Sequence, residues 1–407
     1  MTFFLDSLRE LYIITSDTAF FWAPFIFGYA FWKIWVHYVQ ADFIKNIKWV
    51  MFEVRIPKEI YKPPQAMEMV LAALDQPSAG SKIEQYWKGR IPLWFSLEIV
   101  SIEGSLHFFI RTPVKFKDLI ESRVYSQYSE AEISEAPDYT EFVSFGKDRK
   151  IKIFATDFVL TKADPFPIKT YIDYGLDKGF VDEKQRFDPM TPLLEFLGSV
   201  GPKEQVWVQI LVKAAKKNTY KKEDGTYGDW RDEARELIKK MTVGEQKEAE
   251  EGKLPPLFRL TKTQNENIAD IERNMAKTGL DCGVRVLYLA EKDRFNPGQI
   301  SSMMGAFKQF NSEELNGFKP ARTTSLDYPW DKIDESMNDF RVGKMRRKMF
   351  NSYRLRSYFY PPYERKPFIL TTEELATIFR FPSAIAETPT LKRIESKKSE
   401  PPANLPI

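Results

Sequence analysis

Cysteine and histidine are nearly missing from this chain. Among its 407 residues there are one cysteine, Cys282, and two histidines, His37 and His107. A single cysteine cannot form an internal disulfide, which fits a reducing compartment. It also cannot complete a zinc site, because neither histidine has sequence neighbours that would supply the other ligands. We therefore expect no metal and no cofactor, and we expect both histidines to be structural or surface residues.

The common catalytic motifs are missing as well. The sequence holds neither a Gly-x-Ser-x-Gly elbow nor a His-Glu-x-x-His helix. The nearest imitation of a phosphate-binding loop, residues 198–203, has the wrong glycine spacing and no Ser or Thr after its lysine. The acidic pair Glu373 and Glu374 is typical of a helix start, where the helix dipole favours negative charge. These observations predict a protein that is not an enzyme.

The chain also lacks an excess of charge of either sign. Charged residues make up 29% of the sequence, yet the net charge is only +3, so the overall balance indicates no particular partner. Aromatic residues are abundant at 14%, and they supply ample apolar material for buried cores. After the N-terminal region, the remaining length is enough for two domains of ordinary size.

One long hydrophobic run lies near the N-terminus. The stretch Leu11–Trp32 contains about 22 residues and a single charge, Asp17, and as a helix it would rise about 33 Å, enough to cross a membrane. Residues 15–17 are good N-cap residues, so the helix is predicted to start there and to run to about Tyr38, with a kink at Pro24. Residues 1–40 are therefore predicted to be a membrane anchor. The side chains expected to contact lipid are Phe20, Phe21, Trp22, Phe25, Ile26, Phe27, Tyr29, Phe31 and Trp32.

The flanking charges predict the orientation of this anchor. Arg9 is the only basic residue before it, whereas Lys33, Lys45 and Lys48 follow. Because the positive flank usually stays in the cytoplasm, residues 39–407 are expected on the cytoplasmic side of the inner (cytoplasmic) membrane, with a single span. A cleaved signal peptide is disfavoured because the first ten residues carry acidic side chains, and a buried core helix is disfavoured by the Phe- and Trp-rich run at a chain terminus.

The next part of the chain, residues 45–185, is predicted to be a first α+β unit. Alternating apolar residues and turn signals indicate strands at 48–56, 93–100, 105–111 and 131–134. Prolines at 63–64 and 113 open helices after the first and third of these strands. The resulting order β-α-β-β-α-β is the ferredoxin-like pattern. Residues 142–174 read as a strand-rich extension of this unit, with strand-like pieces at 141–145, 150–160 and 165–171.

Residues 186–330 are predicted to form a second α+β unit of similar shape. Its expected elements are strands at 205–213 and 284–290, a helix capped by Asn296-Pro297, and an extended piece at 318–322. A charged helical insertion, residues 214–278, interrupts it, with helices at 230–241 and 261–277 and a solvated loop at 244–256. A capping box at Thr263 and Glu266 would begin the second of these helices. The fold class is thus α+β: a transmembrane helix followed by two ferredoxin-like units.

A basic segment dominates residues 331–388, which are predicted to form a C-terminal subdomain. Residues 341–356 predict a helix whose basic side chains are candidates for contact with nucleic-acid phosphates or anionic lipid headgroups. These side chains are Arg341, Lys344, Arg346, Arg347, Lys348, Arg354 and Arg356. The alternative is an amphipathic helix docked by its apolar side, with its charges simply solvated. A short helix capped at Thr371 or Thr372 follows, and residues 389–407 are a Pro-, Lys- and Ser-rich tail.

Several stretches together resemble the region that precedes the motor domain in bacterial membrane-associated ATPases of the conjugative, type IV secretion kind. These stretches, spread over residues 45–407, are Lys48–Ile60, Met67–Leu74, Phe108–Ile133, Tyr171, Asp188–Val212, Val284–Pro320 and Phe350–Ile407. The most recognisable is FFIRTPVKFKDLIESRVYSQYSEAEI, a strand, Arg-x-Pro, a helix and then Tyr-x-Gln-Tyr. In long members of that group a Pro-Ala-Asn-Leu-Pro linker leads into a P-loop ATPase domain, whereas this chain ends there.

The resemblance implies a non-catalytic, membrane-anchored scaffold or adaptor subunit that docks a separate P-loop ATPase, with either DNA or protein as the transported cargo. The alternative is a membrane-tethered nucleic-acid-binding protein that uses the basic helix and a ferredoxin-like sheet, although no RNA-recognition signature is present. An enzyme of unrecognised type is a third hypothesis. Nucleic acid and a second copy of the chain stay open as further partners.

Overall fold

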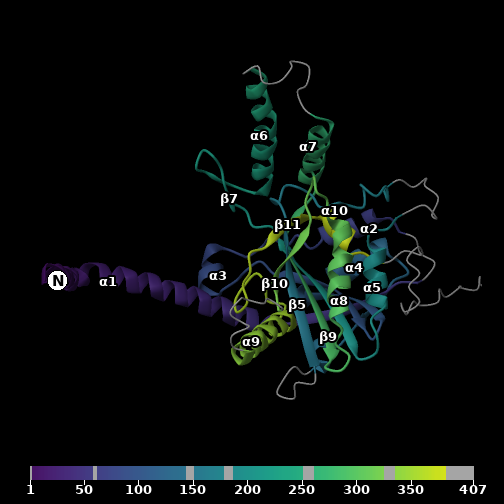
Figure 1. Ribbon diagram of the computed structural model, residues 1–407, viewed down its shortest axis with the longest axis horizontal. Helices are drawn as coiled ribbons and strands as arrows, with labels where there is room; N and C mark the ends of the chain where they lie inside the picture. The colour runs from purple at the N-terminus through teal and green to yellow at the C-terminus, as the bar shows by residue number, and fades with distance from the viewer. Residues whose placement is uncertain are drawn as a thin grey trace, which may run out of the picture. The chain divides into compact units, whose positions relative to one another are not determined.

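A computed structural model gives the fold of the chain (Figure 1). It describes residues 2–57, 62–143, 151–177, 187–250, 261–324 and 335–381, with only the backbone at 2–14, 243–250 and 335–339. The predicted tail, residues 389–407, lies outside the described residues. The chain divides into two compact units, one formed by residues 1–48 and 78–92 and the other by residues 49–77 and 93–407. The predicted mixture of helices and strands after an N-terminal apolar helix is confirmed.

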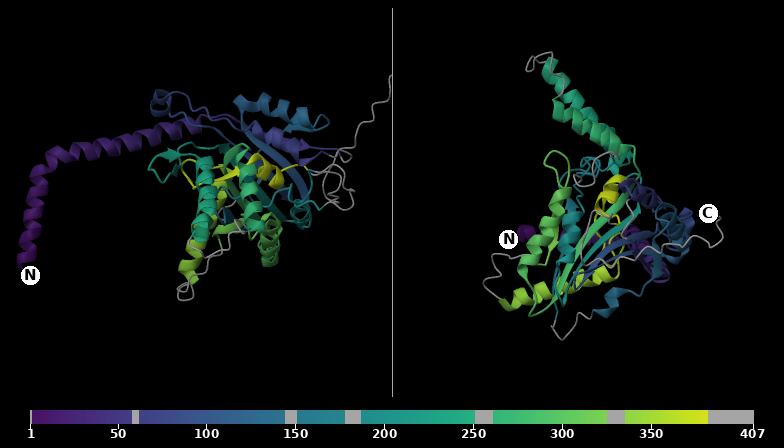
Figure 2. Two further views of the ribbon diagram at one scale, coloured as in Figure 1. Left: turned by 90° about the horizontal axis from the view of Figure 1, so that it is seen from above. Right: turned by 90° about the vertical axis from the view of Figure 1, so that its right-hand side faces the viewer.

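The first unit consists of a long helix, α1 (Thr2–Lys45), and a short one, α3 (Lys82–Trp87). The predicted helix start at residues 15–17 is wrong, because the upstream Leu, Arg and Glu residues are good helix formers and extend the helix back to Thr2. Its end also lies beyond the predicted Tyr38. Pro24 lies inside the helix, and Figure 2 shows α1 bent rather than straight, as expected for a helix with an internal proline.

The second unit is built on a nine-stranded sheet in which neighbouring strands pair antiparallel, in the order β10-β5-β9-β6-β2-β3-β1-β4, with β11 also paired to β9. The strands are β1 (Trp49–Arg55), β2 (Trp94–Ile102), β3 (Ser105–Pro113), β4 (Glu132–Glu135), β5 (Ile151–Leu160), β6 (Glu204–Ala214), β9 (Gly279–Glu291), β10 (Phe318–Thr323) and β11 (Phe368–Thr371). Apart from the pieces predicted at 141–145 and 165–171, the strands predicted for the two α+β units are present, and they belong to one sheet because β2 pairs with β6.

The sheet has two halves with the same internal order. The first half is β4-β1-β3-β2, with α2 (Pro64–Ala72) between β1 and β2 and α4 (Lys117–Gln127) between β3 and β4. The second half is β10-β5-β9-β6, with α5 (Thr191–Gly198) between β5 and β6 and α8 (Pro297–Phe307) between β9 and β10. Strand β5 falls in the stretch predicted as an extension of the first unit, yet it pairs with β9 and β10 of the later half.

The insertion between β6 and β9 contains the small strands β7 (Tyr220–Lys221) and β8 (Tyr227–Gly228) and the helices α6 (Trp230–Glu250) and α7 (Lys262–Met275). The two helices lie side by side and extend beyond the sheet (Figure 1). Residues 244–250, predicted to be loop, continue α6. The capping box that begins α7 is Thr261 with Gln264, not Thr263 with Glu266, so the helix starts at the earlier of two similar signals.

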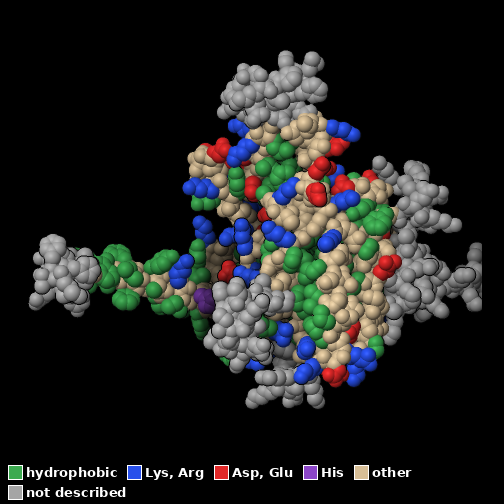
Figure 3. All heavy atoms as spheres, viewed as in Figure 1, with side chains coloured by type: hydrophobic (Ala, Val, Ile, Leu, Met, Phe, Trp, Pro, Cys, Tyr) green, Lys and Arg blue, Asp and Glu red, His purple; other side chains and the backbone are tan. Residues whose placement is uncertain are grey.

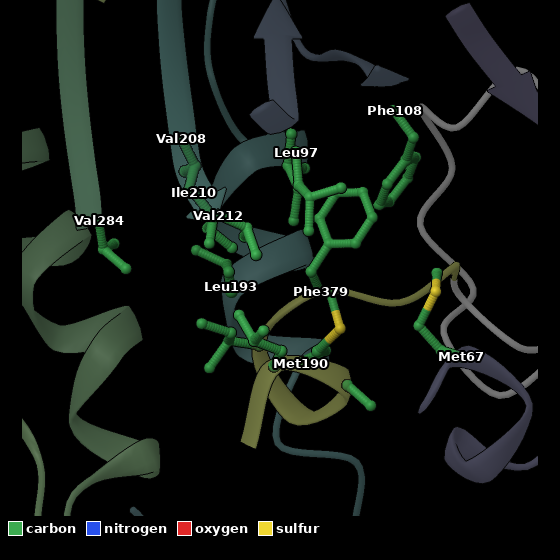
Figure 4. Packing of buried hydrophobic residues seen from close by; sticks show 14 of the residues in the cluster. Met67, Leu97, Phe108, Met190, Leu193, Val208, Ile210, Val212, Val284 and Phe379 are labelled. Carbon is green, nitrogen blue, oxygen red and sulfur yellow. The ribbon is translucent and has the colours of Figure 1, made fainter. Parts of the chain in front are cut away.

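The two faces of the sheet are covered by different helices. The larger apolar core packs α2, α4, α5, α8 and α10 (Thr372–Ile378) against one face. Figure 4 shows part of this core, where Leu97 and Val208 of the sheet lie near Leu193 and Phe379. The other face carries a smaller apolar cluster that includes Met349, and this residue comes from α9 (Glu335–Arg354).

Local predictions hold best where a cap or an alternating pattern is clear. Asn296 caps α8, as predicted, and of the two predicted cap residues, Thr371 and Thr372, it is Thr371 that caps α10. The strand predicted at 141–145 is wrong at its start, because residues 139–142 form the 3-10 helix η2 (Tyr139–Phe142), which is capped by Asp138. The strand predicted at 150–160 is present as β5, whereas residues 165–171 form no strand. Two further 3-10 helices are η1 (Val114–Phe116) and η4 (Lys308–Phe310).

Candidate functional site

The first candidate site is the surface of α1. Every side chain predicted to contact lipid is exposed, among them Phe25 at 80%. The part of the helix from Thr15 to Lys45 is long and apolar enough to cross a membrane, by length and composition. Figure 3 shows hydrophobic side chains over the surface of this helix. Large aromatic side chains left in water carry a substantial free-energy cost, so this surface requires an apolar environment or a partner.

The short helix α3 packs on the C-terminal part of α1. The indole N–H of Trp35 donates a hydrogen bond to the carbonyl oxygen of Tyr86, 3.1 Å away, and the rings of Trp35 and Trp87 lie 5.8 Å apart. Gly89 follows α3 with a φ of +63°, and a Cβ at this position would lie 2.1 Å from the carbonyl oxygen of Val39. Only glycine permits both this backbone conformation and this close approach.

The second candidate site is the basic helix α9. Counted from the first of its exposed basic residues, the other three lie three, four and ten residues further along, which places all of them on one side of the helix. They are Lys344, Arg347, Lys348 and Arg354. On the other side of the helix Met349, Phe350 and Tyr353 are buried against the sheet. The predicted amphipathic docking is therefore present, and a stripe of positive charge stays accessible.

Not every predicted basic residue belongs to that stripe. Arg341 and Arg346 are half-buried and engaged in contacts of their own. Arg356 lies beyond the end of α9 and is fully buried, so its assignment to a phosphate- or lipid-binding surface is wrong. The physical reason is the presence of two carboxylates that pair with it, the buried Glu98 of the sheet and the half-buried Asp138 that caps η2, which the local sequence around residue 356 does not reveal.

Arg356 forms a bidentate ion pair with Glu98 of β2. Its Nε lies 3.0 Å from Oε1 and its Nη2 lies 3.1 Å from Oε2, and both side chains are fully buried. The same guanidinium also binds both carboxylate oxygens of Asp138. Arg356 holds a φ of +50°, a left-handed conformation that favours glycine, so the paired charges keep a strained backbone in place.

Hydroxyl groups complete the surroundings of Glu98. The Tyr139 hydroxyl donates to Glu98 Oε2 over 2.7 Å, and the Tyr353 hydroxyl of α9 lies 2.6 Å from that of Tyr139. Ser96 donates to the other oxygen, Oε1. Burial raises the pKa of Glu98, but the charge and hydrogen bonds of Arg356 outweigh it and bring the pKa below its ordinary value. Glu98 is therefore ionised at neutral pH.

A polar row continues from Glu98 across the sheet. Gln209 of β6 stands opposite Glu98, Arg285 of β9 stands opposite Gln209, and Asp157 of β5 stands opposite Arg285. Gln209 donates to the backbone carbonyl of Tyr353 in α9 over 3.2 Å. Arg285 Nε lies 2.8 Å from Asp157 Oδ1, with both side chains buried. The row therefore fastens the end of α9 and the segment after it to several strands at once.

The histidines take the places expected of structural or surface residues. His107 Nδ1 lies 2.7 Å from Glu53 Oε1 in a half-buried pair, and His37 is exposed on α1. Within the ranges that the structure describes, no group of three or more His, Cys, Asp or Glu side chains is placed to hold a metal ion. Cys282 is fully buried, and this burial raises the pKa of its thiol.

Two of these features escape prediction from sequence. The helix α3 is signalled only by its capping box, Ser81 with Glu84, which stands within a stretch that otherwise reads as loop. The buried network is signalled only by Glu98, a lone carboxylate within an apolar strand (WFSLEIV). Its partner Arg356 lies 258 residues away, so no spacing argument connects them.

Comparison with known families places the chain in one of them. The model of a domain of unknown function, DUF8128, matches residues 45–393, which is most of the chain. The protein therefore belongs to the DUF8128 family. A comparison with curated proteins gives no match. The matched region begins at the end of α1 and includes the whole sheet and α9.

Proposed function

We propose that this protein is a membrane-anchored, non-catalytic scaffold or adaptor subunit of a type IV secretion or conjugation-like machine. The observation that carries the proposal is α1, a helix of membrane-spanning length whose aromatic side chains are exposed, on a chain that continues into a large sheet. The basic residues that follow the apolar run favour a single span of the inner membrane, with the sheet on the cytoplasmic side.

The proposed partner is a P-loop ATPase carried by a separate polypeptide. Support comes from the collinear stretches, within residues 45–407, that resemble the non-motor region of conjugative ATPases. The DUF8128 match, residues 45–393, covers most of the part of the chain that carries this resemblance. In this role the sheet provides a rigid platform, and the basic helix and the Pro-rich tail provide contacts for the machine.

We further propose that each half of the sheet is a ferredoxin-like unit. In β4-β1-β3-β2 the first and third strands of the unit are central, and a helix follows each of them. The half β10-β5-β9-β6 repeats this arrangement if its first strand is β5, with the α6–α7 insertion placed between its second and third strands. This arrangement favours a second unit that begins near residue 151 rather than at residue 186.

The test of the scaffold role is an affinity purification of the full chain from native membranes in mild detergent. Proteins that stay bound are identified by mass spectrometry, and the purification is repeated without residues 389–407. We expect an ATPase with a P-loop to co-purify and to be lost or depleted with the truncated chain. Purified protein alone should hydrolyse no ATP.

Each result of this purification is informative. An ATPase that co-purifies with both versions would place its docking surface in the folded sheet rather than in the tail. A chain that purifies alone under conditions that keep other membrane complexes intact would contradict the scaffold role. ATP hydrolysis by the isolated chain would contradict the non-catalytic assignment.

A second candidate function is membrane-tethered nucleic-acid binding, favoured by the exposed basic stripe of α9. Replacing Arg347 and Lys348 with Glu should abolish DNA binding and flatten its dependence on salt, because each lost phosphate contact reduces counterion release. A matched control is Lys216→Glu/Lys217→Glu, which reverses two adjacent exposed charges outside α9. Equal DNA affinity of the wild-type and Arg347→Glu/Lys348→Glu chains would eliminate this function and leave the scaffold role untouched.

A further inference from the structure

The short helix α3 exposes an apolar surface of its own. Ile83 is 71% exposed and Trp87 62%, and Tyr86 next to Trp87 is exposed as well. A six-residue helix that leaves these side chains in water gains little from its own hydrogen bonds. Two lysines, Lys82 and Lys88, lie exposed at its two ends. Trp, Tyr and Lys close together are the side chains that favour the interface between membrane and water.

Contacts with α1 determine the position of α3 along the axis of that helix. Its aromatic residues contact Trp32 and Trp35, and the following Gly89 approaches the backbone of Val39. The apolar run Leu11–Trp32 is about as long as the roughly 20 residues that cross the hydrocarbon core, so α1 leaves the core near Trp32. The contacts with α3 therefore lie where α1 passes from hydrocarbon into the headgroup region.

We propose that α3 is a second membrane contact, which lies in the headgroup region of an anionic bilayer next to the exit of α1. This inference rests on the proposed membrane anchor and adds to it a named lipid-contacting surface, Ile83, Tyr86 and Trp87. The aromatic rings would lie among the upper acyl chains, and the ammonium groups of Lys82 and Lys88 would meet lipid phosphates. The apolar surface of α3 is continuous with that of α1, which favours lipid over a separate protein partner.

Such a contact would restrict how α1 tilts and rotates where it leaves the membrane. A single transmembrane helix is free to rotate about its own axis, whereas one that carries α3 in the headgroup region has one preferred orientation. The close approach at Gly89 holds α3 directly against α1, because a φ of +63° and backbone contact with Val39 leave no room for a side chain between them.

The test is lipid-dependent quenching of a probe at single cysteines in the full chain. Cys282 is fully buried, so it can stay, and the unmodified chain controls for its labelling. Ile83→Cys and Trp87→Cys carry an environment-sensitive fluorophore in vesicles of neutral and acidic phospholipid, with and without lipid that bears a nitroxide near its headgroup. Phe25→Cys reports on the anchor. Met69→Cys, 64% exposed on α2, is the control for a water-exposed site.

We expect nitroxide lipid to remove about half or more of the emission at positions 83 and 87, and little at position 69. Absent quenching at position 25 would overturn the membrane anchor itself. Quenching at position 25 together with values at 83 and 87 equal to that at 69 would overturn only the role of α3. Protection of 83 and 87 from both nitroxide lipid and aqueous iodide would also overturn it, since protein would then cover them.

A backbone variant checks the geometry. Gly89→Ala places a Cβ against the carbonyl oxygen of Val39 and should displace α3 from α1. We expect quenching at position 87 to fall while quenching at position 25 persists. Unchanged quenching at position 87 would contradict the claim that contact with α1 holds α3 at the headgroup level.

Discussion

The two faces of the nine-stranded sheet consist of alternate residues of the same strands, yet they are stabilised differently. Leu97 and Glu98 are neighbours on β2, and both are buried. Leu97 belongs to the large apolar core beneath five helices. Glu98 faces the side covered by α9, where it pairs with Arg356. At this point of β2, one face is therefore stabilised by apolar burial, which does not depend on pH, and the other by a buried ion pair, which does.

The ion pair explains why the C-terminal end of the basic helix α9 has a fixed position on the sheet. Apolar packing alone tolerates sliding and repacking, whereas a buried two-pronged ion pair has one geometry. Arg356 and Gln209 fix the last turn of α9 to β2 and β6, while Met349 and Phe350 supply burial. The exposed stripe of α9 is thereby presented in a defined orientation, whichever partner it meets.

The largest expected effect comes from breaking the charged face. Arg356→Leu would leave Glu98 buried without a counter-charge, and we expect the free energy of unfolding to fall by about 3–5 kcal/mol. Denaturant titration of the detergent-solubilised chain, followed by circular dichroism, measures it. Arg354→Leu, at an exposed basic residue two positions away, should have little effect. Equal losses in both variants would show that the buried pair is not what stabilises this face.

On the apolar face, Leu97→Ala should lower the free energy of unfolding by about 3 kcal/mol, because a fully buried side chain is replaced by a cavity. The same denaturant titration applies. This loss should be equal at pH 5 and pH 8, since no ionisable group is removed. A loss that changed strongly with pH would mean that the two faces are coupled through β2 rather than independent.

Lowering the pH should destabilise the charged face selectively. The pKa of Glu98 lies below its ordinary value of 4.5 because Arg356 and hydrogen bonds outweigh its burial. The pair therefore contributes its full stability above about pH 4.5, and this contribution is lost as the pH falls through the lowered pKa. We expect unfolding titrations between pH 6 and pH 3 to show a steep loss for the wild-type chain. In a Glu98→Leu/Arg356→Leu double variant the loss should be shallower.

The apolar face holds a carboxyl of opposite behaviour, which gives a smaller effect. Burial raises the pKa of Glu374, at the start of α10, to about 7. The folded chain keeps this proton up to about pH 7 and the unfolded chain releases it near 4.5, so stability falls as the pH rises between these values. Glu374→Gln cannot ionise and should flatten that fall. An unchanged slope from pH 5 to pH 7 would contradict the raised pKa.

The smallest effect on stability should come from the exposed stripe of α9. Lys344→Glu and Lys348→Glu alter only solvated charges, so the unfolding midpoint should stay where it is in the wild-type chain. A change in binding to DNA or to the ATPase, without a change in the midpoint, would assign the stripe to a partner. A large loss of stability would instead place these lysines in the contact with the sheet.

Much of the local structure is predictable because it depends on neighbours in sequence. Alternation predicts β1, β2 and β3, and caps predict α8 and α10, since these signals act over a few residues. The first half of the sheet follows directly from them. The second half is harder to predict because β5 stands far from its partners β9 and β10 in the sequence. Strand pairing is decided by the whole sheet, not by any local pattern.

The candidate sites divide in the same way. The apolar surface of α1 can be predicted from the sequence, because the length and hydrophobicity of its aromatic-rich run by themselves indicate a membrane-spanning helix. The basic segment can also be predicted to be a helix, but the sequence does not show which of its charged side chains are exposed. Lys348 is exposed and Arg356 is buried, although both belong to the same basic segment.

The apolar helix, the strand pattern and the near absence of cysteine and histidine follow from the sequence alone, because each is a property of composition or short-range period. Only the tertiary structure decides that β2 and β6 join the two halves into one sheet and that Glu98 meets Arg356. It also decides that Gly89 brings α3 against α1. The physical reason is that these contacts join residues far apart in sequence, and burial then makes their pairing strong.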